Sequence, residues 1–571
     1  MDLEYGSDVV ADLLVQAGVR YAAFNPGATF RGLHDSLVHL PGAPEIVLCT
    51  AEGISVAVAQ GYAKATGRPM AVLLHDIVGL QAASMAIYNA WCDRAPMLLI
   101  GGTGPMAKSR RRPWIDWIHT ASSQAELVRD FVKWDDQPHD LASVPESFAR
   151  ALHAATSSPS GPVYLCYDVT LQEDAVAAGF TPEALARYVE PTAPAASPEQ
   201  LDELAELLRV AKAPMIVAGY VGHDPAAFAA LTELAEALAA PVLDTGVRHA
   251  FPTGHPLCGT GVPGLAERAD VVLVLDVDDL RGRYPDLLGD GTRPGTATVV
   301  HAGVGHLRVR GWSHAYQALA PLHRHLTADA DSVAAGLLHR VRAEPPDAAL
   351  VAARTTQLHN EIRARRARLL AAAGIATASG AVPRERVIFE LGAALQRSGL
   401  TFVLGNGTND RLEHRLWDLN RPRQHAGWHA GGGLGYGLGA SIGVALGSPA
   451  GTIVVDVQAD GDALFTPSAL WTMAHSGLPV LVVVLNNRQY GNSVGHAVDV
   501  AGARGRPVQE RYVGTALTNP EVHFAALAES FGVWSSGPVS AADQLAPVFD
   551  AALEVLGRGR PALIDVIVPG L

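Results

Sequence analysis

The sequence has few cysteines, few charged residues and no apolar stretch long enough to span a membrane. Of its 571 residues only four are cysteine, and no two of them have the close spacing of paired metal ligands: Cys49, Cys92, Cys166 and Cys258. We therefore expect reduced core cysteines and a cytoplasmic location. The first ten residues are acidic and amphipathic, unlike a signal peptide. The lack of a long apolar run argues against a membrane partner.

Positive charge is also in short supply. The chain has 43 Lys and Arg against 57 Asp and Glu, a net charge of −14. Such a surface is repelled by a phosphate backbone, which argues against nucleic acid as a partner. The composition that remains, 49% hydrophobic and 18% charged, is typical of well-packed globular domains. Since the chain is too long for a single core, we expect several domains.

Helical and strand-like segments alternate along the chain, which predicts an α/β protein with three doubly wound parallel-sheet domains. The first domain is expected in residues 1–185 and a middle domain in residues 198–345. An Ala- and Arg-rich helical linker follows in residues 346–381, and the third domain occupies residues 382–571.

Polar side chains follow two consecutive apolar strands of the third domain, at Asp460 and Asn487. The elements involved are a strand at 452–457, a helix at 469–476 with Thr466 as its N-cap, and a strand at 479–485. Strands joined in this way are parallel, and α/β sheets bind ligands at the carboxyl ends of such strands. A carboxylate and an amide oxygen suit Mg²⁺ that bridges to a phosphate. Taken singly, the two residues could instead be turn and strand-end residues.

With these motifs, the chain resembles thiamine diphosphate-dependent enzymes of the pyruvate decarboxylase and acetolactate synthase superfamily, and benzoylformate decarboxylases above all. The resemblance covers essentially the whole chain and implies a pyrimidine-binding, a middle and a diphosphate-binding domain, in that order. It implies Mg²⁺ ligands at Asp460, Asn487 and the backbone carbonyl of Gln489, with Gly461 close to the diphosphate.

A second stretch, TAEGISVAVAQGYAKATGRP (residues 50–69), is similar to the segment of the family that carries the catalytic glutamate. The resemblance implies that Glu52 bonds the pyrimidine ring and so enables the cofactor's own amino group to act as the base. Ala51 stands where the family often has histidine. The alternative for Glu52 is a surface residue favoured by the helix dipole.

The resemblance implies further cofactor contacts. In WHAGGGLGYGLGASIG (residues 428–443), Leu434 would wedge between the two cofactor rings and the Gly432 carbonyl would accept a hydrogen bond. A helix-packing glycine run is the alternative, and a dinucleotide loop is disfavoured because no apolar strand precedes it. Thr408 and Asn409 would bind the diphosphate, although a plain turn fits nearly as well. The remaining expected contacts are Pro26, Gly27, Asp462, Tyr490 and Gly491.

On the substrate side, the resemblance implies catalytic roles for His75, at a strand end, and for His119, in a basic, Trp-rich loop. A structural histidine is the alternative for His75, and a solvated charge run is the alternative for the loop. The substrate pocket is expected to include Ala28, Asn492, Ser493 and His496. Ala28 stands where relatives carry a polar residue, and Asp462 stands where they carry a small one.

These features predict thiamine diphosphate- and Mg²⁺-dependent cleavage or formation of a carbon–carbon bond next to a carbonyl, as in a 2-oxo acid decarboxylase or carboligase. An acyloin or 2-hydroxyacyl lyase of the same superfamily is the alternative. From other classes, a flavin- or nicotinamide-dependent oxidoreductase and a catalytically degenerate regulatory paralogue remain. The implied partners are a small-molecule substrate and a second copy of the chain, in a homodimer or homotetramer. Nothing in residues 202–340 marks a flavin site.

Overall fold

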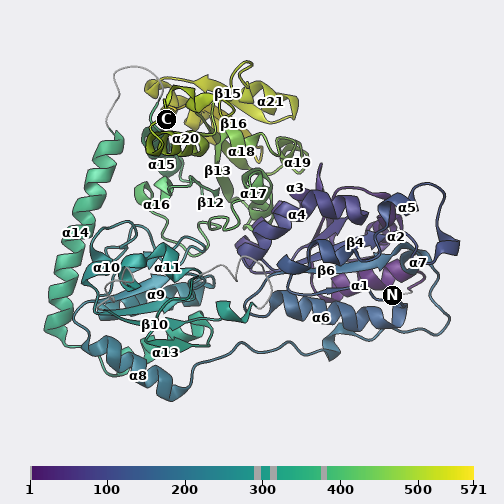
Figure 1. Cartoon of the computed structure of the whole chain (residues 1–571), viewed down its shortest axis with the longest axis horizontal. Coiled ribbons are helices and arrows are strands. Elements are labelled where there is room, and N and C mark those ends of the chain that lie inside the picture. Colours follow the sequence, from purple (N-terminus) through teal and green to yellow (C-terminus); the bar gives the residue numbers. More distant parts are fainter. Residues whose placement is uncertain (1–2, 289–296, 309–317, 375–381, 571) are drawn as a thin grey trace. The chain divides into compact units, whose positions relative to one another are not determined.

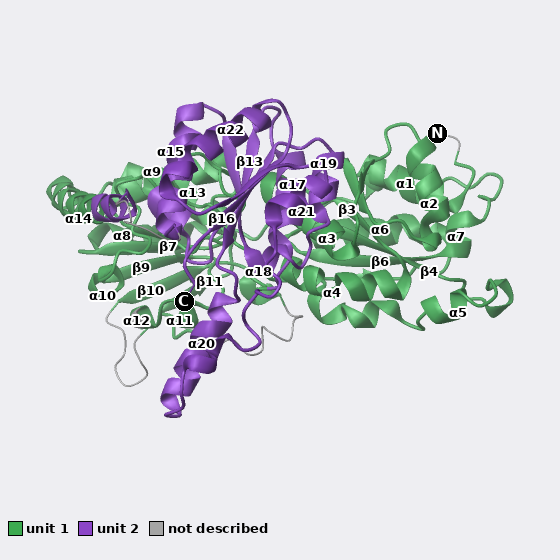
Figure 2. Ribbon diagram, turned by 90° about the horizontal axis from the view of Figure 1, so that it is seen from above, with its two compact units in different colours: residues 1–365, 418–432 green, residues 366–417, 433–571 purple. Residues whose placement is uncertain are grey.

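Three parallel β-sheets form the framework of the protein (Figure 1), and this confirms the predicted fold class. The computed structural model describes residues 3–288, 297–308, 318–374 and 382–570. The chain divides into two compact units, coloured in Figure 2. Unit 1 comprises residues 1–365 and 418–432, and unit 2 comprises residues 366–417 and 433–571. The predicted boundaries of three domains stay a prediction.

The first sheet of unit 1 has six strands, and all its neighbouring strands pair in parallel. In spatial order they are β2 (Glu45–Leu48), β1 (Tyr21–Phe24), β3 (Ala71–Leu74), β4 (Met97–Thr103), β6 (Pro162–Asp168) and β5 (Asp135–Asp136). The helices around it are α1 (Gly6–Gln16), α2 (Arg31–His39), α3 (Glu52–Thr66), α4 (Asp76–Cys92), α5 (Asp116–His119), α6 (Val144–Thr156) and α7 (Val169–Glu173). Figure 1 shows α3 and α4 on one side of this sheet and α1 and α6 on the other. Burial on both faces explains why its strands are apolar runs without alternation.

The second sheet of unit 1 is also parallel. Its order is β11 (Arg324–Leu326), β10 (Thr298–Ala302), β9 (Val271–Leu275), β7 (Pro214–Ala218) and β8 (Val242–Asp244). The helices of this part are α8 (Pro198–Val210), α9 (Pro225–Leu238), α10 (Leu265–Arg268), α11 (Leu280–Arg283), α12 (Pro285–Leu288) and α13 (Ala330–Ala343). Beyond α13, the 27-residue helix α14 (Ala348–Gly374) occupies most of the segment predicted as a helical linker.

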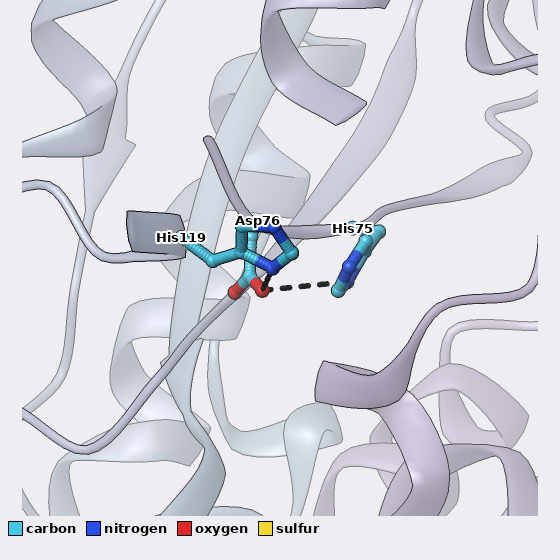
Figure 3. Close-up of side chains that lie close together, drawn as sticks. All are labelled: His75, Asp76 and His119. Atoms are coloured by element: carbon cyan, nitrogen blue, oxygen red, sulfur yellow. Dashed lines mark ion pairs between the residues drawn. The ribbon is translucent and has the colours of Figure 1, made fainter. Parts of the chain in front are cut away.

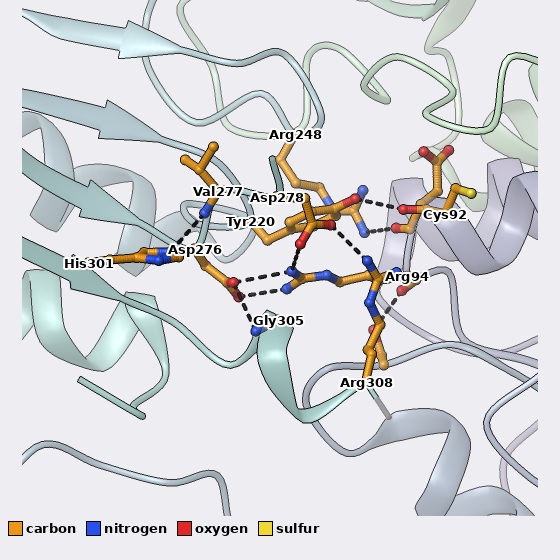
Figure 4. A network of polar contacts seen from close by, with 12 residues as sticks. Cys92, Arg94, Tyr220, Arg248, Asp276, Val277, Asp278, His301, Gly305 and Arg308 are labelled. Carbon is orange, nitrogen blue, oxygen red and sulfur yellow. Dashed lines mark hydrogen bonds and ion pairs between the residues drawn. The ribbon is translucent and has the colours of Figure 1, made fainter. Parts of the chain in front are cut away.

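A buried ionic network joins these two sheets within unit 1 (Figure 4). Arg94, just after α4, donates to both carboxylate oxygens of Asp276 at 2.6 and 3.2 Å and to Asp278 at 2.7 Å. Its guanidinium lies 3.8 Å from the ring centroid of Tyr220, and Arg308 also donates to Asp278 at 2.9 Å. Burial alone would lower the pKa of Arg94, but the two carboxylates raise it. The carboxyl end of β9, where ligands bind in many α/β sheets, is therefore occupied by an arginine of the same unit.

Unit 2 contains the third sheet, in which all neighbouring strands are again parallel. Its order is β12 (Phe402–Asn406), β13 (Ile453–Ala459), β14 (Val480–Asn486), β16 (Ala562–Ile567) and β15 (Trp534–Val539). The helices are α15 (Arg384–Ser398), α16 (Leu412–Leu416), α17 (Tyr436–Gly447), α18 (Asp460–Ala463), α19 (Ala469–His475), α20 (Gly491–Ala503), α21 (Phe524–Ser530) and α22 (Leu545–Gly557).

Three local features differ from the sequence-based expectations. His75, expected at a strand end, is the N-cap of α4, which begins at Asp76, and a short helix α18 begins directly at Asp460. Thr466 is not the N-cap of α19, which is Ser468. The Thr466 hydroxyl instead donates to the carbonyl of Gly435 at 2.9 Å. Among the described helices, none has the length and hydropathy needed to cross a membrane.

Candidate functional site

Asp460 and Asn487 directly follow β13 and β14, which pair in parallel, so both lie at the same edge of the third sheet. Asp460 is buried, and its Oδ1 accepts a hydrogen bond from the Gly461 N–H at 2.8 Å. Burial raises the pKa of Asp460 to about 6, against the opposing effect of the backbone N–H groups of Gly461, Arg488 and Gln489. The carboxylate therefore faces the turn that follows β14, as the motif predicted.

The oxygen atoms at this edge fit Mg²⁺. Oδ2 of Asp460 is buried and has no hydrogen-bond partner among the described residues. The side-chain oxygen of Asn487 accepts one hydrogen bond, from the Gln489 N–H at 3.1 Å, and keeps a second lone pair. A β-carbon built on Gly461 would lie 2.6 Å from the ring of Tyr490, so only glycine fits there. Hard oxygen donors beside an open backbone suit a hydrated cation that bridges to a diphosphate.

The glycine segment beside this edge is held by side chains of the Asp460 turn. Asp462 accepts a hydrogen bond from the Gly435 N–H and another from the Gln458 side chain at 2.8 Å. Since the Thr466 hydroxyl donates to the Gly435 carbonyl, both the N–H and the carbonyl of Gly435 are hydrogen-bonded. Its φ of +86° favours glycine. The preceding residue, Leu434, is 43% exposed, which is unusual for a large apolar side chain beside a buried helix and leaves it free to contact a ligand.

The start of the glycine segment is held inside unit 1. The ammonium of buried Lys64 donates to Asp93 at 2.8 Å and to the carbonyls of residues 427 and 428, each at 3.0 Å. Asp93 also accepts from the Ala430 N–H at 2.7 Å. Burial lowers the pKa of Lys64, and Asp93 opposes that shift. The chain just before Gly432, which has φ +68°, is thereby fixed to helices α3 and α4.

Other predicted cofactor and pocket residues of unit 2 lie on its surface or in a capped turn. Both the backbone N–H and the hydroxyl of Thr408 donate to Glu413, and the hydroxyl accepts from the Leu412 N–H at 2.9 Å. These contacts are those of a turn that leads into α16, and a plain turn is the alternative stated for this stretch; the neighbouring Asn409 is exposed. Helix α20 begins at Gly491 and carries three exposed side chains predicted for the pocket: Asn492, Ser493 and His496.

In unit 1, the turn after β1 packs against His75, the residue that follows β3. A β-carbon built on Gly27 would lie 2.2 Å from Cγ of His75, and the Thr29 hydroxyl lies 3.0 Å from Nδ1 of that histidine. Glu52, the first residue of α3, reaches the same region, because its Oε1 would lie 3.1 Å from a β-carbon built on Gly79 of α4. Glu52 also acts electrostatically on His75. The structure thus brings Gly27, Glu52 and His75 together, with Pro26 and Ala28 exposed on the same turn.

Asp76 links His75 to His119 (Figure 3). Its Oδ2 lies 3.4 Å from Nδ1 of His75 and 3.6 Å from Nδ1 of His119, and the two imidazole rings meet edge to face with centroids 5.4 Å apart. A nitrogen from each histidine and a carboxylate oxygen lie within 4.8 Å of one another, a set that also has the composition of a metal site. The sequence prediction missed Asp76. Its place within two residues of the end of a buried strand is the signal that could have found it.

The basic loop next to His119 is neutralised by carboxylates. Arg110 pairs with Asp174 at 2.7 Å and Arg112 with Asp116 at 2.8 Å, which favours a structural role over attraction of an anionic substrate.

Three protein-family models match the chain, and all describe thiamine pyrophosphate enzymes. The N-terminal thiamine pyrophosphate-binding domain matches residues 5–127, the central domain residues 201–284 and the C-terminal thiamine pyrophosphate-binding domain residues 405–566. The matched segments contain Glu52, His75, His119, Asp460 and Asn487.

Curated relatives align along nearly the full chain. Benzoylformate decarboxylase of Pseudomonas aeruginosa is 26% identical over 97% of both chains. Acetolactate synthase 2 of Zea mays is 24% identical over 99% of this chain and 85% of its own length. The fold matches that of a thiamine diphosphate-dependent 4-hydroxybenzoylformate decarboxylase from Rhodococcus jostii, with a TM-score of 0.77 at 24% identity over 99% of both chains. With its three parallel sheets and these matches along its length, the chain belongs to the thiamine pyrophosphate enzyme family.

Proposed function

We propose that the protein uses thiamine diphosphate and Mg²⁺ to cleave or form the carbon–carbon bond next to a carbonyl, with a 2-oxo acid as donor. The observation that carries this proposal is the pair Asp460 and Asn487 at the ends of adjacent parallel strands, with the Oδ2 atom of Asp460 buried and unpartnered among the described residues. An orphaned carboxylate oxygen is costly unless a cation or donor meets it.

The cofactor-holding residues follow from this edge of the sheet. Asp460, Asn487 and the Gln489 carbonyl would hold Mg²⁺, and the open backbone at Gly461 would approach the diphosphate. When bound, thiamine diphosphate supplies the electron sink for breaking the bond next to the carbonyl. The work of the protein is then to bind, to orient and to move protons.

The proton-handling residues lie in unit 1. Glu52 holds a proton at its carboxyl oxygen for a ring nitrogen of the cofactor, which is the acid–base role of a positioned carboxyl group. His75 offers its Nε2 to the substrate, because Thr29 and Asp76 face the other ring nitrogen. The similarity to benzoylformate decarboxylase supports a 2-oxo acid as the donor substrate. The similarity to acetolactate synthase, at 24% identity, supports carboligation as a second candidate reaction.

The test is a substrate panel on the purified protein supplied with thiamine diphosphate and Mg²⁺. The panel contains pyruvate, benzoylformate and 4-hydroxybenzoylformate, and release of carbon dioxide from a 2-oxo acid is measured with a coupled assay. Addition of an aldehyde to the same reactions tests for acyloin products. Acyloins and 2-hydroxyacyl thioesters are included as donors to detect the lyase alternative. Release of carbon dioxide from no 2-oxo acid, with cofactor bound, would refute the donor class.

Cofactor binding is measured separately, by the shift of the thermal unfolding midpoint. Thiamine diphosphate with Mg²⁺ should stabilise the protein. Thiamine diphosphate with a metal chelator, or thiamine in place of thiamine diphosphate, should not, because stabilisation needs both the metal and the diphosphate. We further propose that the chain self-associates, as the resemblance implies; Glu52 and Asp460 lie in different compact units. Equilibrium sedimentation of the loaded protein tests this. The cytoplasmic location stays a prediction.

A further inference from the structure

We propose that Asp76, His75 and His119 form a proton-holding cluster, in which the Asp76 carboxyl passes a proton between the two histidines and supplies the acid–base capacity that Ala28 lacks. This inference rests on the proposed function and assigns a part in it to Asp76, which no motif marks.

The geometry of Asp76 is that of a shared partner. One carboxylate oxygen, Oδ2, lies within 3.6 Å of Nδ1 of both histidines. Neither distance is short enough for a full hydrogen bond, and a small movement toward one ring lengthens the contact with the other. Oδ1 is buried and has no hydrogen-bond partner among the described residues. A carboxylate without backbone donors depends on its histidines, or on a proton, for neutralisation.

The backbone shows that this carboxyl is held in place. Asp76 adopts φ +47°, a conformation uncommon for residues other than glycine, at the first position of α4. Its side chain is only 3% exposed, whereas those of His75 and His119 are 16% and 23% exposed. The histidines can therefore meet a substrate, while the aspartate stays behind them. Asp76 therefore acts on the substrate only through the histidines, as a positioning residue.

The surroundings favour a single shared proton. The charged and titratable groups that face the cluster are Glu52 from α3, Arg112 from the preceding loop, Asp116 from α5, and Tyr164 and Cys166 from β6. Burial, and then Asp116, raise the pKa of Asp76 to about 7, against the opposing effect of Arg112. Burial and His119 lower the pKa of His75. The neutral forms of both Asp76 and His75 are therefore favoured, and Asp76 exchanges its proton near neutral pH.

The transfer to substrate breaks one N–H bond of His75 and one O–H bond of Asp76 and forms one new bond to hydrogen at each of the two acceptors. When His75 gives the proton on Nε2 to the substrate, the Asp76 carboxyl gives its own proton to Nδ1 of the ring, so the second acceptor gains what the O–H bond loses. Water, or His119 in its imidazolium form, then returns a proton to the Asp76 carboxylate. The net change is one proton moved and no change in oxidation state. Ala28, next to Gly27 and Thr29, which both contact His75, has no group that can do this.

A metal ion is the competing occupant of the same three side chains. One observation favours the proton. The Thr29 hydroxyl lies 3.0 Å from Nδ1 of His75, the ring nitrogen that faces Asp76, so this nitrogen already has a hydrogen-bond partner.

The experiment uses the full chain without cofactor and follows protonated carboxyl groups by infrared spectroscopy across a pH series. Wild type minus Asp76→Asn should isolate a carboxyl band that is lost with a midpoint near pH 7. Asparagine tolerates positive φ, so this variant keeps the backbone. His75→Gln and His119→Gln should each shift that midpoint by about half a pH unit or more, because each removes a ring nitrogen with which the Asp76 carboxyl shares its proton.

The matched control is Asp456 of β13, a buried carboxyl whose pKa burial also raises to about 7 but which is bonded by Asn406 at 3.0 Å. Its band, isolated with Asp456→Asn, should not move in either histidine variant. An Asp76 midpoint that stays fixed in both histidine variants overturns the proposal, because the carboxyl is then buried for structural reasons alone. One equivalent of Zn²⁺ bound by wild type and not by Asp76→Asn overturns it in favour of a metal site. Failure of thiamine diphosphate to bind overturns the proposed function instead and leaves these spectra unchanged.

Discussion

Asp76 in unit 1 and Asp460 in unit 2 occupy similar places and have different neighbours. Each is the first residue of a helix that follows a buried parallel strand, Asp460 directly after β13 and Asp76 one residue beyond the end of β3. Both are 2% exposed, and burial raises the pKa of both. Around Asp460 the opposing groups are backbone N–H groups, whereas Asp76 faces two histidines.

The difference shows how one position in an α/β sheet supports two chemistries. Backbone amides do not titrate, so they hold the Asp460 carboxylate as a fixed anion that suits a cation. Imidazoles gain and lose protons near neutral pH, so the charge of Asp76 changes together with theirs. The strand end places the carboxyl, and the partners decide whether it serves a metal or a proton.

The largest expected effect is that of Glu52→Gln, which should separate proton transfer in unit 1 from cofactor binding in unit 2. Glu52→Gln should lower turnover by roughly a hundred- to ten-thousand-fold, because the amide cannot give or take the proton required by the cofactor. The thermal shift produced by thiamine diphosphate and Mg²⁺ should stay, since the metal edge is untouched. Turnover is measured on the best 2-oxo acid of the panel. The control is Glu45→Gln, because Glu45 is an exposed residue of β2. Full turnover by Glu52→Gln would mean that the proton is handled elsewhere.

Asp460→Ala should have the complementary phenotype. Removal of the carboxylate should abolish Mg²⁺-dependent binding of the cofactor, and with it a stabilisation of about 3 kcal/mol at a hundredfold excess over the dissociation constant. The measurement is the thermal shift with thiamine diphosphate and Mg²⁺, with the exposed Asp543→Ala of the same unit as control. Equal shifts in Asp460→Ala and wild type would place the diphosphate at another site.

The pH dependence of stability sharpens the comparison on the Asp76 side. Because burial raises the folded-state pKa of Asp76 to about 7, the folded state keeps its proton while the unfolded chain loses it. Stability from this group is therefore present at low pH and is lost as pH rises from about 4 to about 7. Relative to wild type, Asp76→Asn should gain on the order of a few kcal/mol over that window and stay level above it.

Unfolding midpoints of the cofactor-free protein, measured between pH 4 and 8, check this. Asp168→Asn is a matched control, because Asp168 ends β6 of the same sheet but accepts from the backbone N–H groups of Met106 and Thr170 at 2.8 and 2.7 Å. It should lose a capping interaction throughout the pH series. A parallel response of the two variants would contradict the distinction between amide and imidazole partners.

What the sequence could predict follows the same division. The strands predicted at 452–457 and 479–485 overlap β13 and β14, and the edge with Asp460 and Asn487 followed from them, because apolar runs and strand–helix–strand connections are local signals. The approach of Asp76 to His119 was not predictable, since it depends on how residues 104–123 fold back over α4. The Thr466 cap was wrong for the same reason: a distant carbonyl, that of Gly435, competes for the hydroxyl.

The smallest expected effect concerns Asp462, an additional carboxylate two residues from Asp460. It is directed away from a metal role by its contacts, because its two oxygens accept from the Gly435 N–H and the Gln458 side chain. Asp462→Ser, which introduces the small residue usual in relatives, should therefore leave the apparent Mg²⁺ affinity within about threefold, as a serine can also bond a backbone N–H.

The same substitution should still be visible in the glycine segment. Hydrogen exchange of the cofactor-free protein should speed up in the peptide that contains Gly435, because serine is a shorter and uncharged acceptor and a charge-assisted bond is lost. Exchange at Asp460–Ala463 should change little, since Oδ1 of Asp460 keeps its bond to the Gly461 N–H. A large fall in Mg²⁺ affinity, measured by titrating metal at fixed cofactor, would place Asp462 in the metal site. That result would make two carboxylates, and not one carboxylate with backbone amides, the partners of the cation, and the contrast with Asp76 would then rest on the histidines alone.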